Sequence, residues 1–160
     1  VDGRWYVGPG EGLFALLARR ATRIECRRLP EPAGAAASFH GRDVFAPVAA
    51  RVALGMAVAA GPLTAAELEQ PGWPDELFRV VYIDRFGNAI TGVRAAAIDT
   101  SALLQVRGQL LRSARTFADV QPGAGFWYVN SSGLVEFAVN QGRACDVLQL
   151  EVGTPFACMV

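Results

Sequence analysis

Residues 38–43, with the sequence SFHGRD, hold the side chains of this chain that are best suited to chemistry. They include His40, the only histidine among the 160 residues. An imidazole exchanges its proton near neutral pH, so His40 can act as a general base without extreme surroundings. Gly41 has no side chain, which leaves room for a water, an ion or a substrate atom beside the backbone. The alternative is a histidine that only packs and forms hydrogen bonds.

A helix is expected directly after this motif, because an apolar run with helical spacing follows it. The run consists of Val44, Phe45, Val48 and Val52. The free N–H groups of the first turn would favour an anion or a lone pair close to His40. Pro47 does not fit deep inside a helix. The helix therefore either starts near Pro47, after a turn over residues 41–45, or is kinked there, and both versions leave His40 on the entry loop.

Composition excludes some classes of protein. Acidic and basic residues balance at 15 each, so no clustered basic excess of the kind that binds nucleic acid is expected. Apolar residues make up 52% and charged residues 19%, a typical globular balance. No apolar run is long enough to span a bilayer, and no spacing suggests metal ligands, so neither membrane nor metal is expected. Cys26, Cys145 and Cys158 are widely spaced and are expected to be free thiols in the cytoplasm.

The first part of the chain predicts an α/β arrangement. Residues 4–8 are typical of a buried strand, residues 12–20 of a helix and residues 22–29 of a second strand. A strand–helix–strand series favours a parallel sheet. Because the chain starts close to an apparent central strand, residues 1–66 are interpreted as the C-terminal part of a parallel-sheet α/β domain.

The second part predicts a different architecture. Residues 67–77 contain the sequence QPGWP and are interpreted as a linker. Residues 78–160 are rich in strand signals and predict a small antiparallel β-barrel domain. A type II′ hairpin turn is expected over residues 86–89. The expected strands are residues 79–84, 89–93, two about Gly108 within 103–111, 126–130, 134–139 and 155–160.

Four segments in this order resemble one protein family. They are WYVGPGEGLF at 5–14, SFHGRDVFAPVAA at 38–50, DRFGNAIT at 84–91 and YVNSSG at 128–133. Together they resemble the SAM hydroxide adenosyltransferases (SAM hydrolases), the family that includes the fluorinase and the chlorinase. The resemblance covers nearly the whole chain.

The resemblance implies a displacement at the ribose C5′ of S-adenosylmethionine (SAM). Water or hydroxide attacks, methionine leaves and adenosine forms, with SAM as substrate and with no cofactor or metal. The implied assembly is a homotrimer that binds SAM between one subunit's N-terminal domain and a neighbour's β domain. His40 stands where the family's halogenases carry tyrosine, and Gly41 where the fluorinase carries serine. The pair therefore resembles a hydrolase.

The resemblance also implies roles for individual residues. His40 resembles the histidine of an Asp-Arg-His cluster that activates water, and Phe39 and Gly41 on either side of it are expected to contact the substrate. The cluster's other two members come from a family segment that would precede Val1. The other implied contacts are Asp84 for the methionine ammonium, Phe86 as a pocket wall, Asn88 for the adenine edge, Phe117 stacked on adenine, Tyr128 and Ser131 for the methionine end, and the backbone at Gln141 for adenine.

The residues themselves leave alternatives open. Residues 84–88 can simply form a hairpin turn, because Asp, Gly and Asn are turn formers. Phe117 and Tyr128 can belong to a barrel core, and Arg42 and Asp43 can form a local ion pair or a helix cap. At the level of function, the alternatives are a non-catalytic protein that binds SAM or adenosine and, with less support, a SAM-dependent halogenase.

Overall fold

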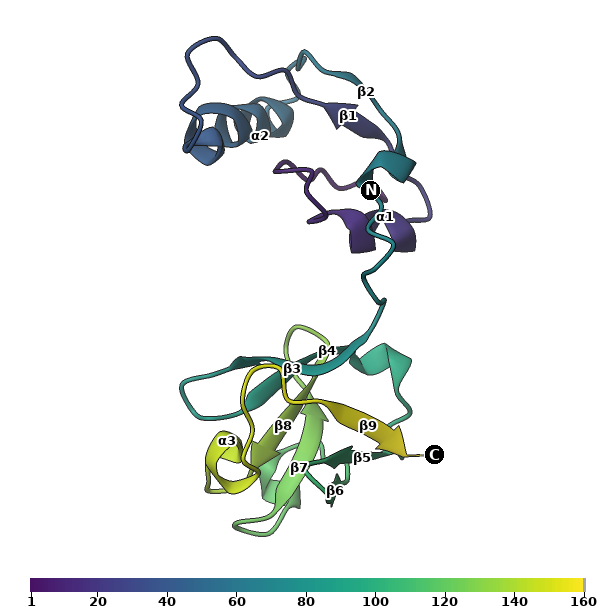
Figure 1. Ribbon diagram of the computed structural model, residues 1–160, viewed down its shortest axis with the longest axis vertical. Coiled ribbons are helices and arrows are strands. Elements are labelled where there is room, and N and C mark those ends of the chain that lie inside the picture. The colour runs from purple at the N-terminus through teal and green to yellow at the C-terminus, as the bar shows by residue number, and fades with distance from the viewer. Residues whose placement is uncertain (160) are drawn as a thin grey trace. The chain divides into compact units, whose positions relative to one another are not determined.

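The computed structural model describes residues 1–159, and the chain divides into two compact units between Trp73 and Pro74. Unit 1 comprises residues 1–73 and unit 2 begins at Pro74 (Figure 1). The division falls inside residues 67–77, the segment interpreted as a linker.

Unit 1 combines short helices with one small sheet. Strand β1 (Cys26–Arg28) pairs antiparallel with β2 (Gly61–Leu63), with Cys26 opposite Leu63. The helical elements are α1 (Ala15–Arg20), the π-helical turn η1 (Gly41–Phe45), α2 (Ala46–Ala53) and the 3-10 turn η2 (Ala65–Leu68).

The predicted parallel sheet is not found in the described residues of unit 1. Residues 4–8 do not form a strand, and Trp5 is 63% exposed, which corrects the prediction of a buried strand. Of residues 22–29, only β1 forms a strand, and its partner is antiparallel. A strand is defined by backbone hydrogen bonds to a neighbour. No described neighbour extends along residues 4–8, so the apolar pattern alone does not produce a strand.

The helix after His40 begins as the first of the two alternatives predicts. Residues 41–45 form η1, and α2 starts at Ala46 with Pro47 in its first turn. Proline is well suited to that position, because its missing N–H would have no partner inside the helix. His40 precedes both elements, at the N-terminal boundary of η1.

Unit 2 consists of antiparallel strands, as predicted, but its two sheets do not close into a barrel in the described residues. The first sheet has the order β3-β4-β8-β7 and the second the order β6-β5-β9. The strands are β3 (Leu77–Ile83), β4 (Ala89–Arg94), β5 (Leu103–Val106), β6 (Gln109–Leu111), β7 (Gly125–Val129), β8 (Leu134–Val139) and β9 (Phe156–Met159). They are joined by the 3-10 turns η3 (Ala95–Ala97) and η4 (Phe117–Asp119) and by the short helix α3 (Ala144–Val147). The predicted strand 155–160 corresponds to β9, and its last residue, Val160, lies outside the described residues.

The core of unit 2 lies on one face of the sheet that contains β8. Val135, Phe137 and Val139 belong to this core, together with Trp127 of β7. Successive side chains of a strand point to opposite faces. Glu136 therefore lies on the other face of the sheet, as does its cross-strand partner Tyr128.

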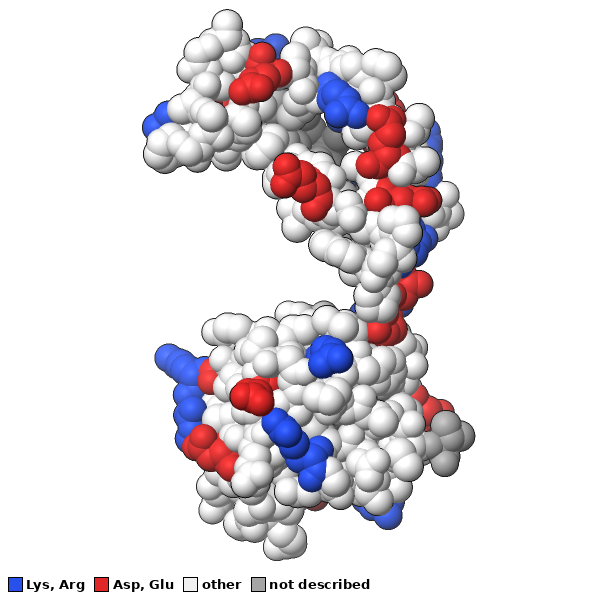
Figure 2. Space-filling model, in the orientation of Figure 1, with Lys and Arg blue, Asp and Glu red and all other residues white. Residues whose placement is uncertain are grey.

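Charged side chains of both signs are interspersed on the face drawn in Figure 2, without a broad basic surface. Among residues 1–159, no helix is both long enough and apolar enough to cross a membrane.

Candidate functional site

The imidazole of His40 is paired with a carboxylate. Its Nε2 lies 3.2 Å from Oε1 of Glu31, in the loop that leads to the motif. The two side chains are 39% and 65% exposed, so solvent reaches both groups. The ring also meets the edge of Phe45, with centroids 6.5 Å apart. A carboxylate beside an imidazole orients the ring, which suits proton abstraction by the other ring nitrogen. Sequence reasoning missed Glu31, because no pattern in this Pro- and Ala-rich loop indicates that the loop folds back toward His40.

Arg42 and Asp43 form the local ion pair that was one of the two alternatives. Arg42 donates from Nε to Oδ1 of Asp43 at 2.5 Å and from Nη2 to Oδ2 at 3.0 Å. The hydrogen bond from Arg42 holds the pKa of Asp43 below its ordinary value, and the backbone N–H of Ala36 adds to this effect. The Arg42 guanidinium also lies over the ring of Phe39, 4.6 Å from its centroid.

The first turn after His40 offers fewer free donors than expected. The backbone N–H groups of Arg42 and Asp43 both donate to the carbonyl oxygen of Phe39. These two N–H groups are therefore not available to an anion, which corrects that part of the prediction. Gly41 fits its predicted role better, because a Cβ built there would meet no atom within 4 Å.

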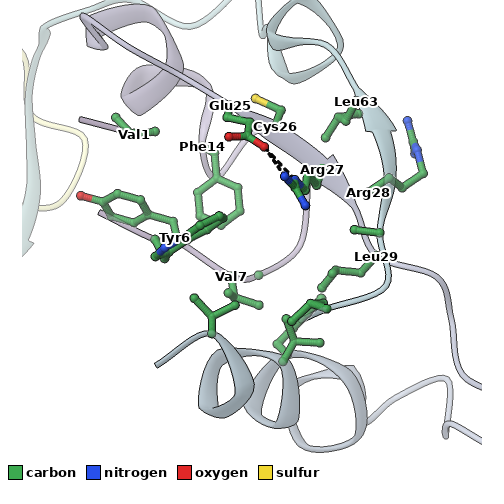
Figure 3. A pocket seen from close by; sticks show the side chains of 18 of the residues that line it. Val1, Tyr6, Val7, Phe14, Glu25, Cys26, Arg27, Arg28, Leu29 and Leu63 are labelled. Carbon is green, nitrogen blue, oxygen red and sulfur yellow. Dashed lines mark hydrogen bonds and ion pairs between the residues drawn. The ribbon is translucent and has the colours of Figure 1, made fainter. Parts of the chain in front are cut away.

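A separate hollow of about 770 Å³ lies in unit 1 between residues 4–14, β1 and α2 (Figure 3). Its walls are largely apolar and include Phe14 and Leu29. Glu25, which also lines it, pairs with Arg27. His40, Phe39 and Gly41 do not line this hollow. The hollow therefore does not coincide with the predicted reaction site.

The β3–β4 hairpin of unit 2 holds Asp84 and Asn88 close together. Oδ1 of Asp84 accepts the backbone N–H of Phe86 at 2.8 Å and of Asn88 at 2.9 Å. The N–H of Gly87 donates to the backbone oxygen of Asp84, and Gly87 has φ +86°. The turn thus spans Asp84 to Asn88 with a left-handed glycine at its end, and not the predicted type II′ pair. Within residues 1–159, the one hydrogen bond to Oδ2 of Asp84 is long, at 3.4 Å from Nδ2 of Asn88.

Residues at the start of helix α3 hold the tip of this hairpin through hydrogen bonds to its backbone. Arg143 donates from Nη1 to the backbone oxygen of Arg85 at 3.0 Å. The backbone oxygen of Gly87 accepts the N–H of Cys145 at 2.8 Å. A side chain at Gly87 would lie 2.7 Å from Cβ of Arg143, so glycine is required here by contact as well as by its φ. The loop that holds Asp84 and Asn88 is therefore anchored at both ends and at its tip.

Three aromatic rings gather on the face of the sheet opposite the core. Phe117 meets Phe126 edge to face at 5.1 Å and lies 5.9 Å from Tyr128. Phe126 is buried, whereas Phe117 remains 39% exposed. Phe126 and Tyr128 border an open hollow of about 1030 Å³. Phe117 is thus partly packed but lies outside the core cluster, and it keeps surface on which a planar ligand can stack.

Beside these rings lies a buried carboxylate that sequence reasoning missed. Glu136 is 4% exposed and accepts the Tyr128 hydroxyl at 2.5 Å and Nδ2 of Asn130 at 3.0 Å. Burial, the hydrogen bond to Glu136 and the charges of Glu136 and Asp84 raise the pKa of Tyr128. The signal was present in the sequence, because Glu136 is the one charged residue in the apolar strand 134–139.

The remaining predicted residues lie at the edges of this face. Ser131 follows Asn130 in the exposed turn between β7 and β8, and Gln141 has φ +55° in the exposed turn after β8. Phe86 is 59% exposed, with the Arg85 guanidinium 4.5 Å from its ring centroid. Unit 2 thus brings Asp84 together with Asn88, and Phe117 together with Tyr128, and in unit 1 Phe39, His40 and Gly41 follow one another at the start of η1.

Both units match known domains. Residues 1–60 match the SAM hydroxide adenosyltransferase N-terminal domain, and residues 78–157 match the SAM hydroxide adenosyltransferase C-terminal domain. The chain belongs to this family. The family predicted from the four sequence segments is thereby confirmed.

Among the relatives of this chain, a protein of Thermus thermophilus named (R)-S-adenosyl-L-methionine hydrolase is 41% identical over 96% of the chain. A protein of Salinispora arenicola with the same name is 40% identical over 92% of the chain. The chain spans 66% and 62% of the length of these two relatives.

Solved structures agree with the family assignment. A conserved hypothetical protein from Thermus thermophilus aligns with a TM-score of 0.63 and 35% identity, over 96% of this chain and 69% of that one. An uncharacterized conserved protein from Thermotoga maritima aligns with a TM-score of 0.68 and 25% identity, over 95% of this chain and 66% of that one.

Proposed function

We propose that this protein hydrolyses SAM to adenosine and methionine. The observation that carries the proposal is 41% identity, over nearly the whole chain, to a protein named (R)-S-adenosyl-L-methionine hydrolase. The His40–Glu31 pair and the open space at Gly41 support it, because the reaction needs a base and room for a small nucleophile.

In the proposed reaction, His40 accepts a proton from water as the water oxygen forms a bond with the ribose C5′. The bond between C5′ and sulfur breaks, and its electron pair returns to sulfur, so that methionine leaves as a neutral thioether. The sulfonium is already a good leaving group, and a general acid is not needed. The protein has to orient the water and accept its proton, and Glu31 holds the imidazole for that task.

The proposal assigns substrate contacts to both units. Asp84, Tyr128 and Ser131 meet the methionine end, and Asn88, Phe117 and Gln141 meet the adenine, with Phe86 as a wall and Phe39 beside the base. We propose further that the protein acts in the cytoplasm as a homotrimer with sites between subunits. It needs no cofactor, because SAM is the substrate. The contacts of Asp84 with Asn88 and of Phe117 with Tyr128 support the assignment within unit 2.

The test incubates the purified protein with SAM and follows adenosine and methionine by chromatography. His40→Ala is expected to slow adenosine formation about 100-fold or more, the range for loss of a general base. Glu69→Gln serves as a control, since Glu69 is an exposed carboxylate away from the motif. Absence of adenosine above the buffer control, or an unchanged rate in His40→Ala, contradicts the proposal. Binding of SAM without turnover favours the non-catalytic alternative.

A further inference from the structure

Glu136 is a buried carboxylate that the proposed reaction does not use. It is 4% exposed on β8, between the buried residues Val135 and Phe137. No ion pair is described for it in residues 1–159, and its two partners are neutral, the Tyr128 hydroxyl and the Asn130 amide. A buried carboxylate without a cation is costly, so its presence here calls for a role.

Asn130 fixes Glu136 in one orientation. Oδ1 of Asn130 accepts the backbone N–H of Ser132 at 2.9 Å and that of Leu134 at 3.0 Å. These two bonds identify the oxygen of the amide, so its NH₂ group must point to Glu136, 3.0 Å away. The YVNSSG turn therefore holds the carboxylate in place from one side.

The Tyr128 hydroxyl is held from the other side. A phenol has a single proton to donate, and here the acceptor at 2.5 Å is Oε1 of Glu136. Burial raises the pKa of Tyr128, and the hydrogen bond to Glu136 and the charges of Glu136 and Asp84 raise it further, so the proton stays on the phenol. Tyr128 is only partly buried, so a ligand can reach its oxygen. Because the proton of the hydroxyl points to Glu136, that oxygen offers the ligand lone pairs and no hydrogen to donate.

We propose that Glu136 is a positioning residue that makes the Tyr128 hydroxyl an acceptor for the ammonium group of the ligand. Asp84 supplies the second acceptor, because the one hydrogen bond that the described residues give its Oδ2 is the 3.4 Å contact from Asn88. Two carboxylates and an acceptor hydroxyl favour a cation and disfavour an anion. The inference rests on the proposed function, which supplies a methionyl group with such an ammonium.

The test measures binding and not turnover. Calorimetry compares S-adenosyl-L-homocysteine, which lacks the reactive sulfonium, with its analogue in which hydrogen replaces the ammonium group, and with adenosine. The unaltered protein is expected to bind the amino ligand about tenfold more tightly than the deamino ligand. Glu136→Gln can donate from its amide to the phenol oxygen, which turns the hydroxyl proton outward. That variant is expected to lose the preference and to keep its affinity for adenosine.

Glu151→Gln is the matched control, because Glu151 is an exposed carboxylate of unit 2 paired with Arg107. It is expected to keep the tenfold preference. Tyr128→Phe is expected to lose the preference as well, and the double variant to lose no more than either single one, since Glu136 acts through Tyr128. This pattern separates positioning from a general loss of packing.

A preference that persists in Glu136→Gln, or its absence from the unaltered protein, overturns the proposal even if adenosine forms from SAM. Conversely, a preference that depends on Glu136 upholds it even if the purified protein releases no adenosine, in which case only the proposed reaction fails. Circular dichroism checks that each variant is folded. If Glu136→Gln does not fold, Tyr128→Phe decides the question, and a retained preference in that variant overturns the proposal.

Discussion

His40 and Glu31 are two exposed side chains that the fold brings within hydrogen-bond distance. They lie nine residues apart in the sequence, and the chain folds back to bring Nε2 and Oε1 to 3.2 Å. Asp43 secures the same fold-back, because its Oδ2 accepts the N–H of Ala36 while both of its oxygens accept Arg42. The geometry of the pair thus depends on a carboxylate that does not touch the imidazole.

Asp43 gives a testable pH dependence. Its pKa is lowered from the ordinary value of 3.8 by Arg42 and then by the N–H of Ala36. A lowered pKa in the folded state contributes stability above the unfolded pKa, and this contribution disappears as the pH falls through the folded value. Asp43→Asn is expected to lower stability at neutral pH and to weaken the further loss below about pH 4.

Urea unfolding of both proteins at neutral pH and at successively lower pH measures this effect. Comparison with the unaltered protein isolates Asp43 from other carboxylates with a lowered pKa, such as Glu67. Curves with the same pH dependence in both proteins would refute the linkage.

Single residues differ in how far the sequence predicts them. Asp84 and Asn88 were predictable as turn formers, and the structure shows both in a turn, although of another type. Gly41 was expected to leave space and does. Glu31 could not be predicted, because its contact depends on the path of a loop without periodicity. Glu136 could have been, because a lone charge in a buried strand requires donors.

At the scale of elements, local pairing was predictable and distant pairing was not. The hairpins β3–β4, β5–β6 and β7–β8 join strands that are neighbours in sequence and have turn formers between them. The pairing of β5 with β9 joins segments that lie far apart in the sequence, and no local pattern encodes it. The predicted parallel sheet is missing from the described residues for a related reason. An apolar segment becomes a strand only where another strand pairs with it through backbone hydrogen bonds.

Gly92 tests how closely β3 and β4 approach. It lies opposite Leu77, and a side chain there would come within 2.7 Å of Cβ and 3.0 Å of the backbone oxygen of that residue. Gly92→Ala is expected to destabilise unit 2 by about 1–3 kcal/mol, the usual cost of overpacking. Thermal unfolding measures this loss. Gly72→Ala is the control, because nothing lies within 4 Å of its Cβ position, and equal midpoints for the two variants would contradict the expectation.

At the scale of the whole molecule, the two units differ in how much core they have. In the described residues of unit 1, the buried apolar side chains are Ala15, Val44 and Leu68, and α2 buries none of its residues. Unit 2 contains one large cluster that includes Trp127, Phe137 and Leu104. Buried apolar area is the main source of folding free energy, so the isolated chain should be much less stable in unit 1.

Hydrogen exchange followed by mass spectrometry measures this difference. Backbone amides of α2 are expected to exchange at least about tenfold faster than those of β8. The slower exchange of β8 would report a higher free energy of opening for that strand. Similar protection in the two units would show that unit 1 gains stability from contacts other than a core of its own.

The anchored β3–β4 hairpin has a consequence for binding strength. Asp84 and Asn88 are held by the turn, and α3 fixes the tip through Arg143 and Cys145. A ligand that meets these side chains does not have to freeze a mobile loop, so little conformational entropy is lost on association. Preorganisation of this kind lets a small polar contact surface discriminate between ligands with a modest number of hydrogen bonds.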